Sequence, residues 1–271
     1  MKTIIFTLLM SSTVWAKPVV LISYYDAFSN ARFNNSQKIA EALALKLNTP
    51  ESAVEIKLCA LNTIFDQAFG QLEECFKNLR EKPVLTLSLG ETSCELKVET
   101  IMRNKDRTIT GPDNAGVNRN GTTIIPEGPD ALGLRYPLPQ MYCALTKEER
   151  SKVKVSNNAG SFVCNNTAYL MSYHYPEIQY GFIHVPSNNC YPLTKLNEDT
   201  VHKISKMIPR AVTFLLQEDE APGLPHEQNE IRLETQKKEL KQLRQVYQND
   251  ACLKEYLTRS KGVDERSLFG L

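Results

Sequence analysis

Residues 18–25 read PVVLISYY, an apolar run rich in Val, Ile and Tyr that stops at Asp26. Similar short runs, bounded by Gly, Pro or Asn, recur at residues 54–61, 83–90, 153–155 and 180–185. β-branched and aromatic residues between such breakers are typical of strands. We therefore expect each of these runs to form a strand.

Helical periodicity separates the first strands. Ile39, Leu43 and Leu47 share one face of a helix predicted over residues 36–47, which Asn and Ser residues precede as caps. A broad apolar stripe predicts a second helix over residues 62–80. This alternation indicates an α/β fold, and we expect a three-layer α/β/α sandwich with a mostly parallel or mixed central sheet.

Composition limits the class of protein. The chain has 271 residues, 42% of them hydrophobic, with 32 basic and 31 acidic residues. A chain of this length and composition can bury a sizeable core, which excludes a disordered or collagen-like protein. The near-zero net charge argues against a nucleic-acid partner, which requires a basic excess. A peptide or small-molecule substrate fits better.

Residues 1–16 have the pattern of a cleaved signal peptide. Lys2 precedes an apolar run from Ile4 to Met10, and Val14, Trp15 and Ala16 lead to Lys17. We therefore expect an exported protein, periplasmic or secreted, whose main domain covers residues 17–217. A buried first strand is the alternative for this stretch, but residues 18–22 already supply one. No later run approaches the ~20 apolar residues of a membrane span.

Export changes how the seven cysteines are interpreted, because thiols outside the cytosol tend to pair. An odd number leaves at least one thiol unpaired if all bridges are internal, and that thiol is a candidate for reactivity. The sequence contains no CxxC pair and no Cys/His cluster with zinc spacing. We expect no structural metal site.

Three later regions have their own character. Residues 105–145 are rich in Gly, Pro and Asn, and a loop this long is usually functional or disordered. A helix is expected over residues 197–216, kinked or interrupted at Pro209. Residues 218–271 form a charged, helical C-terminal extension. This extension is either an arm for oligomerisation or partner binding, or a helix that packs on its own domain. We favour the second interpretation, in which Cys252 could link the extension to the main domain by a disulfide bridge.

The segment from Val155 to Leu170 carries the chemistry, because an Asn/Gly turn follows the strand and a helix is expected to open near Cys164. The positive end of the helix dipole stabilises a thiolate, and the free N–H groups there suit an oxyanion. His184 ends the strand at residues 180–185, where functional groups of parallel strands gather. Taken alone, each residue is more often structural, as a core histidine or a bridged cysteine.

SNNAGSFVCN at residues 156–165 resembles the motif S-N-T-A-G-x-[FY]-[VL]-C-N of the pyroglutamyl peptidase I family, cysteine omega-peptidases that remove N-terminal pyroglutamate. GFIHVP at residues 181–186 is similar to the family's F-x-H-[VI]-P. Both motifs have the family's order and separation, and the resemblance spans roughly residues 18–216. It implies that Cys164 is the nucleophile and His184 the general base and acid.

The remaining family motifs match less closely. VETIMRN at residues 98–104 is similar to V-E-R-x-A-x-N, which implies that Glu99 orients His184, although Thr100 replaces the Arg. The alternative for Glu99 is a solvated carboxylate at a strand end. The resemblance also implies a pocket for the lactam ring lined by Phe28, Phe162 and Val163, whereas aromatic residues near strands are otherwise usually core.

One departure bears on specificity. GETSCE at residues 90–95 stands where the family has G-Q-A-G-G-R, whose Gln lies at the substrate pocket. An ionised Glu91 accepts the lactam N–H but repels its C=O. Either burial keeps Glu91 protonated or the preferred N-terminal group differs. The family's oxyanion arginine has Arg103 and Arg107 as shifted candidates, and we choose Arg107.

We expect a cysteine peptidase that removes an N-terminal pyroglutamyl group from a peptide or small amide, without metal or organic cofactor. If Cys164 is free, six cysteines remain for three bridges, of which Cys59–Cys75 is attractive as a short strand-to-helix link. Two alternatives remain. One is an exported, non-catalytic binding or scaffold protein, and the other is a cysteine amidohydrolase for a different N-terminal cap.

Overall fold

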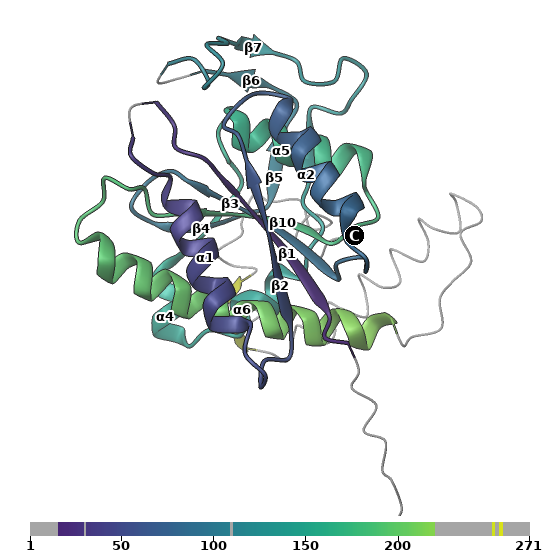
Figure 1. Cartoon of the computed structure of the whole chain (residues 1–271), viewed down its shortest axis with the longest axis vertical. Coiled ribbons are helices and arrows are strands. Elements are labelled where there is room, and N and C mark those ends of the chain that lie inside the picture. Colours follow the sequence, from purple (N-terminus) through teal and green to yellow (C-terminus); the bar gives the residue numbers. More distant parts are fainter. Residues whose placement is uncertain (1–15, 30, 109–110, 220–250, 253–254, 257–271) are drawn as a thin grey trace, which may run out of the picture.

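The computed structural model describes residues 16–29, 31–108, 111–219, 251–252 and 255–256 (Figure 1). Nearly all of the predicted signal and most of the predicted C-terminal extension lie outside the described residues. Within them, a six-stranded sheet carries helices on both faces, which confirms the predicted fold class.

The central sheet is mixed, with the strand order β2-β1-β3-β10-β4-β9. β1, β2, β3 and β10 are parallel, β4 is antiparallel to β10, and β9 is parallel to β4. The predicted runs match the strands β1 Val19–Tyr25, β2 Glu55–Leu61, β3 Leu85–Glu91, β9 Val153–Ser156 and β10 Tyr180–Val185.

β4, Leu96–Glu99, is a strand that the sequence did not predict. Its LKVE sequence is too short and too charged for its alternation to stand out. Leu96 and Val98 are nonetheless buried, while Lys97 between them is half-buried. Pairing with β10 and β9 on its two sides supplies the hydrogen bonds that make this segment a strand.

Helices cover the two faces of the sheet in pairs (Figure 1). α1, Asn35–Leu47, lies beside α6, Leu193–Asp219, on one face. α2, Gln67–Asn78, and α5, Val163–His174, pack together on the other. In α1, the predicted stripe of Ile39, Leu43 and Leu47 is buried, and the side chain of Asn34 caps the helix by accepting the N–H of Ser36.

Two helix boundaries differ from expectation. α2 begins at Gln67 and not at residue 62, because Asp66 takes a left-handed φ of 63° and side chains from other elements hold the backbone before it. Pro209 does not interrupt α6, which runs through it. The apolar residues on either side, Ile208 and Ala211, are fully buried and hold the helix in place.

The Gly- and Pro-rich region folds into short elements beside α5 (Figure 1). Two small two-stranded sheets join β5 to β8 and β6 to β7. Their bounds, with those of the two short helices that follow, are β5 Ile101–Arg103, β6 Asp106–Arg107, β7 Asn120–Thr122, β8 Ala131–Gly133, α3 Leu138–Cys143 and α4 Lys147–Ser151.

Six cysteines form the three bridges Cys59–Cys75, Cys94–Cys190 and Cys143–Cys252, and Cys164 is free. This confirms the predicted strand-to-helix link between β2 and α2. The third bridge ties Cys252 of the C-terminal extension to α3. Next to it, Tyr256 is fully buried against Tyr142, with ring centroids 5.5 Å apart. This part of the extension therefore packs on the chain's own domain.

Among the helices that the structure describes, none is both long enough and apolar enough to cross a bilayer.

Candidate active site

Cys164 lies in the first turn of α5, as predicted. β9 ends at Ser156, and the chain turns through Gly160, whose φ of 81° suits glycine. The first hydrogen bond of the helix runs from the N–H of Asn166 to the carbonyl of Phe162, at 3.1 Å. The backbone N–H groups of the residues between them therefore have no acceptor within the helix. One of them, the N–H of Cys164 itself, acts on the sulfur of Cys164 and lowers its pKa.

Two buried asparagines fix the start of α5. The Oδ1 atom of Asn165 accepts the N–H of Arg103 at 2.8 Å, and its Nδ2 atom donates to the carbonyl of Arg103 at 2.8 Å. The Nδ2 atom of Asn166 donates to Asp106 at 2.8 Å. Neither asparagine was predicted to have a role in the site. The sequence feature that could have indicated their role is a pair of consecutive asparagines at the start of a largely apolar helix.

His184 and Glu99 form a buried pair on neighbouring strands. The Nδ1 atom of His184 lies 2.8 Å from the Oε1 atom of Glu99, and their side chains are 5% and 0% exposed. A carboxylate only accepts, so Nδ1 carries the proton and Nε2 is left to accept another. Glu99 is therefore not the solvated carboxylate of the alternative interpretation.

Gly90 shows that the thiol and the imidazole meet on one face of the sheet. In the ladder between β3 and β10, Gly90 pairs with His184. A Cβ atom built on Gly90 would lie 2.8 Å from the sulfur of Cys164 and 3.0 Å from the ring of Phe182. That ring contacts the imidazole of His184, with centroids 4.9 Å apart. The sulfur thus lies over Gly90, beside the ladder position of His184.

Burial raises the pKa of the Cys164 thiol to about 12, and the carboxylate of Glu91 adds to the rise. The backbone N–H of Cys164 lowers this pKa, but by less than burial raises it. Burial thus outweighs the effect of the helix start on this pKa, which is opposite in direction to the expected stabilisation of a thiolate. Nucleophilic attack requires a base that removes the proton of the thiol.

Phe28, Phe65 and Phe162 form a cluster beside the thiol. The ring of Phe162 makes edge contacts with Phe28 and Phe65, at centroid distances of 5.0 and 5.2 Å. Phe28 follows β1 and Phe65 follows β2, so the cluster lies on the β1 and β2 side of Cys164. Val163, which was also predicted to line the substrate pocket, is fully buried in the core.

Asp113 and Asn114 hold the loops that carry these rings. The Oδ2 atom of Asp113 accepts the N–H of Phe65 at 3.0 Å. The Nδ2 atom of Asn114 donates to the carbonyl of Ala27 at 2.8 Å, next to Phe28. The Gly- and Pro-rich region therefore supports the phenylalanine cluster.

Glu91 contacts backbone at the end of β3. Its Oε2 atom accepts the N–H of Asn35, the first residue of α1, at 2.7 Å, and that of Asn188 at 3.2 Å. Burial raises the pKa of Glu91, while these two N–H groups lower it by less. Glu91 is the last residue of β3, so its side chain leaves at the carboxyl edge of the sheet, where its charge still reaches the Cys164 thiol.

The two candidate arginines lie along the elements that border Cys164. Arg107 is in β6 and Arg103 in β5, and both are exposed. The backbone N–H of Arg107 donates to the carbonyl of Ser161 at 2.6 Å, three residues before Cys164. This bond places β6 beside the turn that leads to Cys164.

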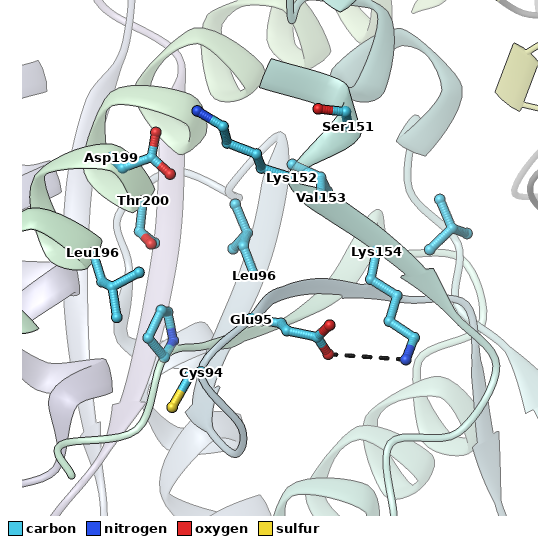
Figure 2. Close-up of a pocket in the computed structure, with 12 residues that line it drawn as sticks. Cys94, Glu95, Leu96, Ser151, Lys152, Val153, Lys154, Leu196, Asp199 and Thr200 are labelled. Carbon is cyan, nitrogen blue, oxygen red and sulfur yellow. Dashed lines mark ion pairs between the residues drawn. The ribbon is translucent and has the colours of Figure 1, made fainter. Parts of the chain in front are cut away.

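Two cavities of about 630 and 460 Å³ lie away from these residues. The larger is shown in Figure 2, between the start of β4, β9 and α6. Neither is lined by Cys164 or His184, and the chemistry of the thiol and imidazole identifies the site better than cavity size does. The described residues include no group of three or more His, Cys, Asp or Glu placed to hold a metal ion.

The family model of pyroglutamyl peptidase matches residues 18–213. Among curated relatives, the pyrrolidone-carboxylate peptidase of Streptomyces coelicolor is 30% identical, over 62% of this chain and 77% of that protein. The enzyme of the same name from Finegoldia magna is 29% identical, over 74% of this chain and 94% of its own length.

Solved structures show the same fold. The crystal structure of pyroglutamyl peptidase I from Bacillus amyloliquefaciens superposes with a TM-score of 0.61 at 23% identity, covering 73% of this chain and 98% of that one.

Proposed function

Because the chain belongs to the pyroglutamyl peptidase family, we propose that it removes N-terminal pyroglutamyl groups with Cys164 as nucleophile, His184 as general base and acid, and Glu99 as the orienting carboxylate. One observation carries this proposal. The one free thiol among the seven cysteines lies over Gly90, whose ladder partner His184 is bound to a buried carboxylate.

The first half of the reaction follows from the charge state of the thiol. Nε2 of His184 takes the proton of Cys164 as the sulfur attacks the carbonyl carbon between the pyroglutamyl group and the next residue. Glu99 stabilises the imidazolium through the Nδ1 hydrogen bond. Because burial raises the pKa of this thiol, His184 is needed as the base that removes its proton.

The second half returns that proton. The imidazolium protonates the leaving amine, the C–N bond breaks, and a thioester to Cys164 remains. His184 then deprotonates a water molecule, which attacks the thioester; the sulfur leaves and recovers its proton. The products are free pyroglutamate and a peptide with a new N-terminus. Every step uses groups of this chain and water.

The start of α5 supplies the donors for the oxyanion. Its first backbone N–H groups belong to the turn that carries Cys164 and have no acceptor within the helix. Arg107, from the neighbouring β6, is our candidate for an added positive charge. Its exposed side chain is free to turn toward the site when substrate is bound.

The phenylalanine cluster serves as the pocket for the lactam ring. Phe28 and Phe162 are half-buried and present apolar surface next to the thiol, which suits a small, flat ring. Phe65 packs behind Phe162 and is expected to hold its orientation. Val163, being fully buried, would support this pocket from behind.

Glu91 favours a second candidate function that uses the same catalytic residues. The family's amide at this position is a carboxyl here, with its pKa raised by burial. A protonated Glu91 donates and accepts as an amide does and preserves pyroglutamate recognition. An ionised Glu91 would favour a different N-terminal cap, in an amidohydrolase with the same catalytic residues.

We also propose that the protein is exported to the periplasm or the exterior. Three disulfide bridges, spread over the domain, support an oxidising compartment. The free cysteine is then the one that the proposed reaction requires.

A fluorogenic pyroglutamyl amide tests the proposed reaction with purified protein. Cys164→Ala and His184→Ala should each lower kcat/KM by at least about 1,000-fold. His174→Ala, at the exposed end of α5, is the matched control and should retain activity. Activity that survives Cys164→Ala would refute the mechanism. Turnover of other capped amides only would favour the amidohydrolase, and tight binding without turnover would favour the scaffold.

A further inference from the structure

Two lysines occupy the positions paired with His184 in the next two strands toward the edge of the sheet. Lys97 of β4 pairs with His184 of β10, and Lys154 of β9 pairs with Lys97. Paired residues in neighbouring strands project to the same face. His184 and the two lysines therefore form one line across three strands. We call Lys97 and Lys154 the lysine row.

Glu99 identifies the face on which this row lies. It follows Lys97 by two residues in β4, so both side chains leave the strand on the same face. Glu99 is bound to the imidazole of His184, and the sulfur of Cys164 lies over the paired position at Gly90. The lysine row therefore shares its face with the catalytic groups.

The charges of the row are only partly compensated. The Oε2 atom of Glu95 lies 3.8 Å from the ammonium nitrogen of Lys97 and 3.8 Å from that of Lys154. Figure 2 shows Lys154 reaching toward Glu95. Both distances exceed that of a hydrogen bond, so the ammonium protons remain available to another acceptor. The two ammonium groups share the carboxylate of Glu95, while the carboxylate of Glu99 on the same face is bound to the imidazole of His184.

The order of strands sets the direction of a bound substrate. The phenylalanine cluster lies on the β1 and β2 side, Cys164 lies over β3, His184 is on β10, and the lysine row is on β4 and β9. In acyl transfer, the acyl group and the leaving amine lie on opposite sides of the attacked carbonyl. With the ring among the phenylalanines, the leaving peptide passes His184 and runs over the lysine row.

We propose that the lysine row binds a carboxylate of the leaving peptide and that the enzyme prefers short, acidic pyroglutamyl peptides. This inference rests on the proposed function. Strands are about 4.8 Å apart and a residue spans about 3.4 Å. Lys97 therefore suits a carboxylate on the first residue after the cleaved bond, and Lys154 one on the second or third.

Matched acid and amide substrates test this preference. The dipeptide pyroglutamyl-alanine and its C-terminal amide differ only in the carboxylate. At low salt, the wild-type kcat/KM should be about 3- to 10-fold higher for the acid, and 0.5 M NaCl should reduce the difference. Lys97→Gln should abolish the difference and leave kcat/KM for the amide within about twofold.

A second pair of substrates separates the two sources of a carboxylate. In the amidated tripeptides pyroglutamyl-alanyl-glutamate and pyroglutamyl-alanyl-glutamine, only the side chain differs in charge. A preference for the glutamate peptide that Lys154→Gln removes would show that the row also accepts an acidic side chain. A preference confined to C-terminal acids would assign the row to the end of short peptides.

Lys152→Gln is the matched control. Lys152 precedes β9, is 57% exposed and pairs with Glu148, outside the lysine row. It should leave every preference unchanged. Equal kcat/KM for acids and amides in the wild type would overturn the inference, as would a preference that survives both row substitutions. The proposed function would still stand in those cases, whereas a wild type that cleaves no pyroglutamyl substrate would reject both.

Discussion

Gly90 makes room for the sulfur of Cys164. Any other residue would place a Cβ atom 2.8 Å from the sulfur, well inside van der Waals contact, and 3.0 Å from the ring of Phe182. Neither neighbour can move freely, because Phe182 is fully buried and Cys164 is fixed by its helix. Glycine is therefore needed at position 90 because the sulfur occupies the space of a side chain, and not because a turn requires it.

Gly90→Ala should lower kcat/KM for a pyroglutamyl amide by at least about tenfold, because the added methyl displaces the sulfur from His184. Gly70→Ala is the control. Gly70 is exposed in α2 with nothing within 4 Å of an added Cβ, and the change should stabilise the helix by about 0.5–1 kcal/mol. Steady-state kinetics and thermal unfolding measure both effects. Full activity in Gly90→Ala would contradict the packing argument.

At the scale of elements, an ionic cluster holds the β6–β7 hairpin against α2 and α5. The guanidinium of Arg119 pairs with both Asp66 and Asp106, and its CZ atom lies 4.5 Å from the centre of the Phe65 ring. Asn166 of α5 donates to both carboxylates. The cluster therefore connects the hairpin to the ring that supports Phe162.

The stability of this cluster should depend on pH. Burial raises the pKa of Asp106 from 3.8 to about 6, against the lowering effect of Arg119. A raised pKa in the folded state means that the contribution of Asp106 to stability is full below about pH 4 and is lost as the pH rises through 6. Replacing Asp106 by Asn removes this titration.

Urea unfolding of the wild type and Asp106→Asn at pH 4, 5, 6 and 7 measures the effect. From pH 4 to 7, the wild type should lose up to about 3 kcal/mol of unfolding free energy relative to the variant. Asp130→Asn, an exposed carboxylate, should show no such trend. A constant difference between wild type and Asp106→Asn across this range would disprove the assignment.

At the scale of the whole molecule, the bridges join regions that are distant in sequence. Cys143–Cys252 spans 109 residues and fixes this part of the extension against α3, and Arg150 of α4 pairs with Glu255 at 3.0 Å. Cys59–Cys75 spans only 16 residues within one strand and helix. A longer closed loop restricts the unfolded chain more.

Removing the longer bridge should therefore destabilise the protein more. The double substitution to Ser at Cys143 and Cys252 should cost about 4–5 kcal/mol, against about 3 kcal/mol for the Cys59 and Cys75 pair. Denaturant unfolding of both variants tests this order, which the opposite ranking would refute. Alkylation of the non-reduced wild type should label Cys164 and leave the six bridged cysteines unlabelled.

Local patterns determined much of this protein. Apolar runs between Gly, Pro and Asn located the strands that make up most of the sheet, and the stripe from Ile39 to Leu47 located α1. Contiguous motifs placed Cys164 at a helix start and His184 at a strand end. These features are readable because each depends on residues that are neighbours in the chain.

Tertiary structure decided the rest. The short strand β4 exists because β10 and β9 pair with it. The register between β4 and β10 brings Glu99 to His184 and pairs Lys97 with His184. Burial by surrounding elements raises the pKa of the Cys164 thiol, against the local effect of its helix. Burial and register arise from segments far apart in sequence, so no local pattern encodes them.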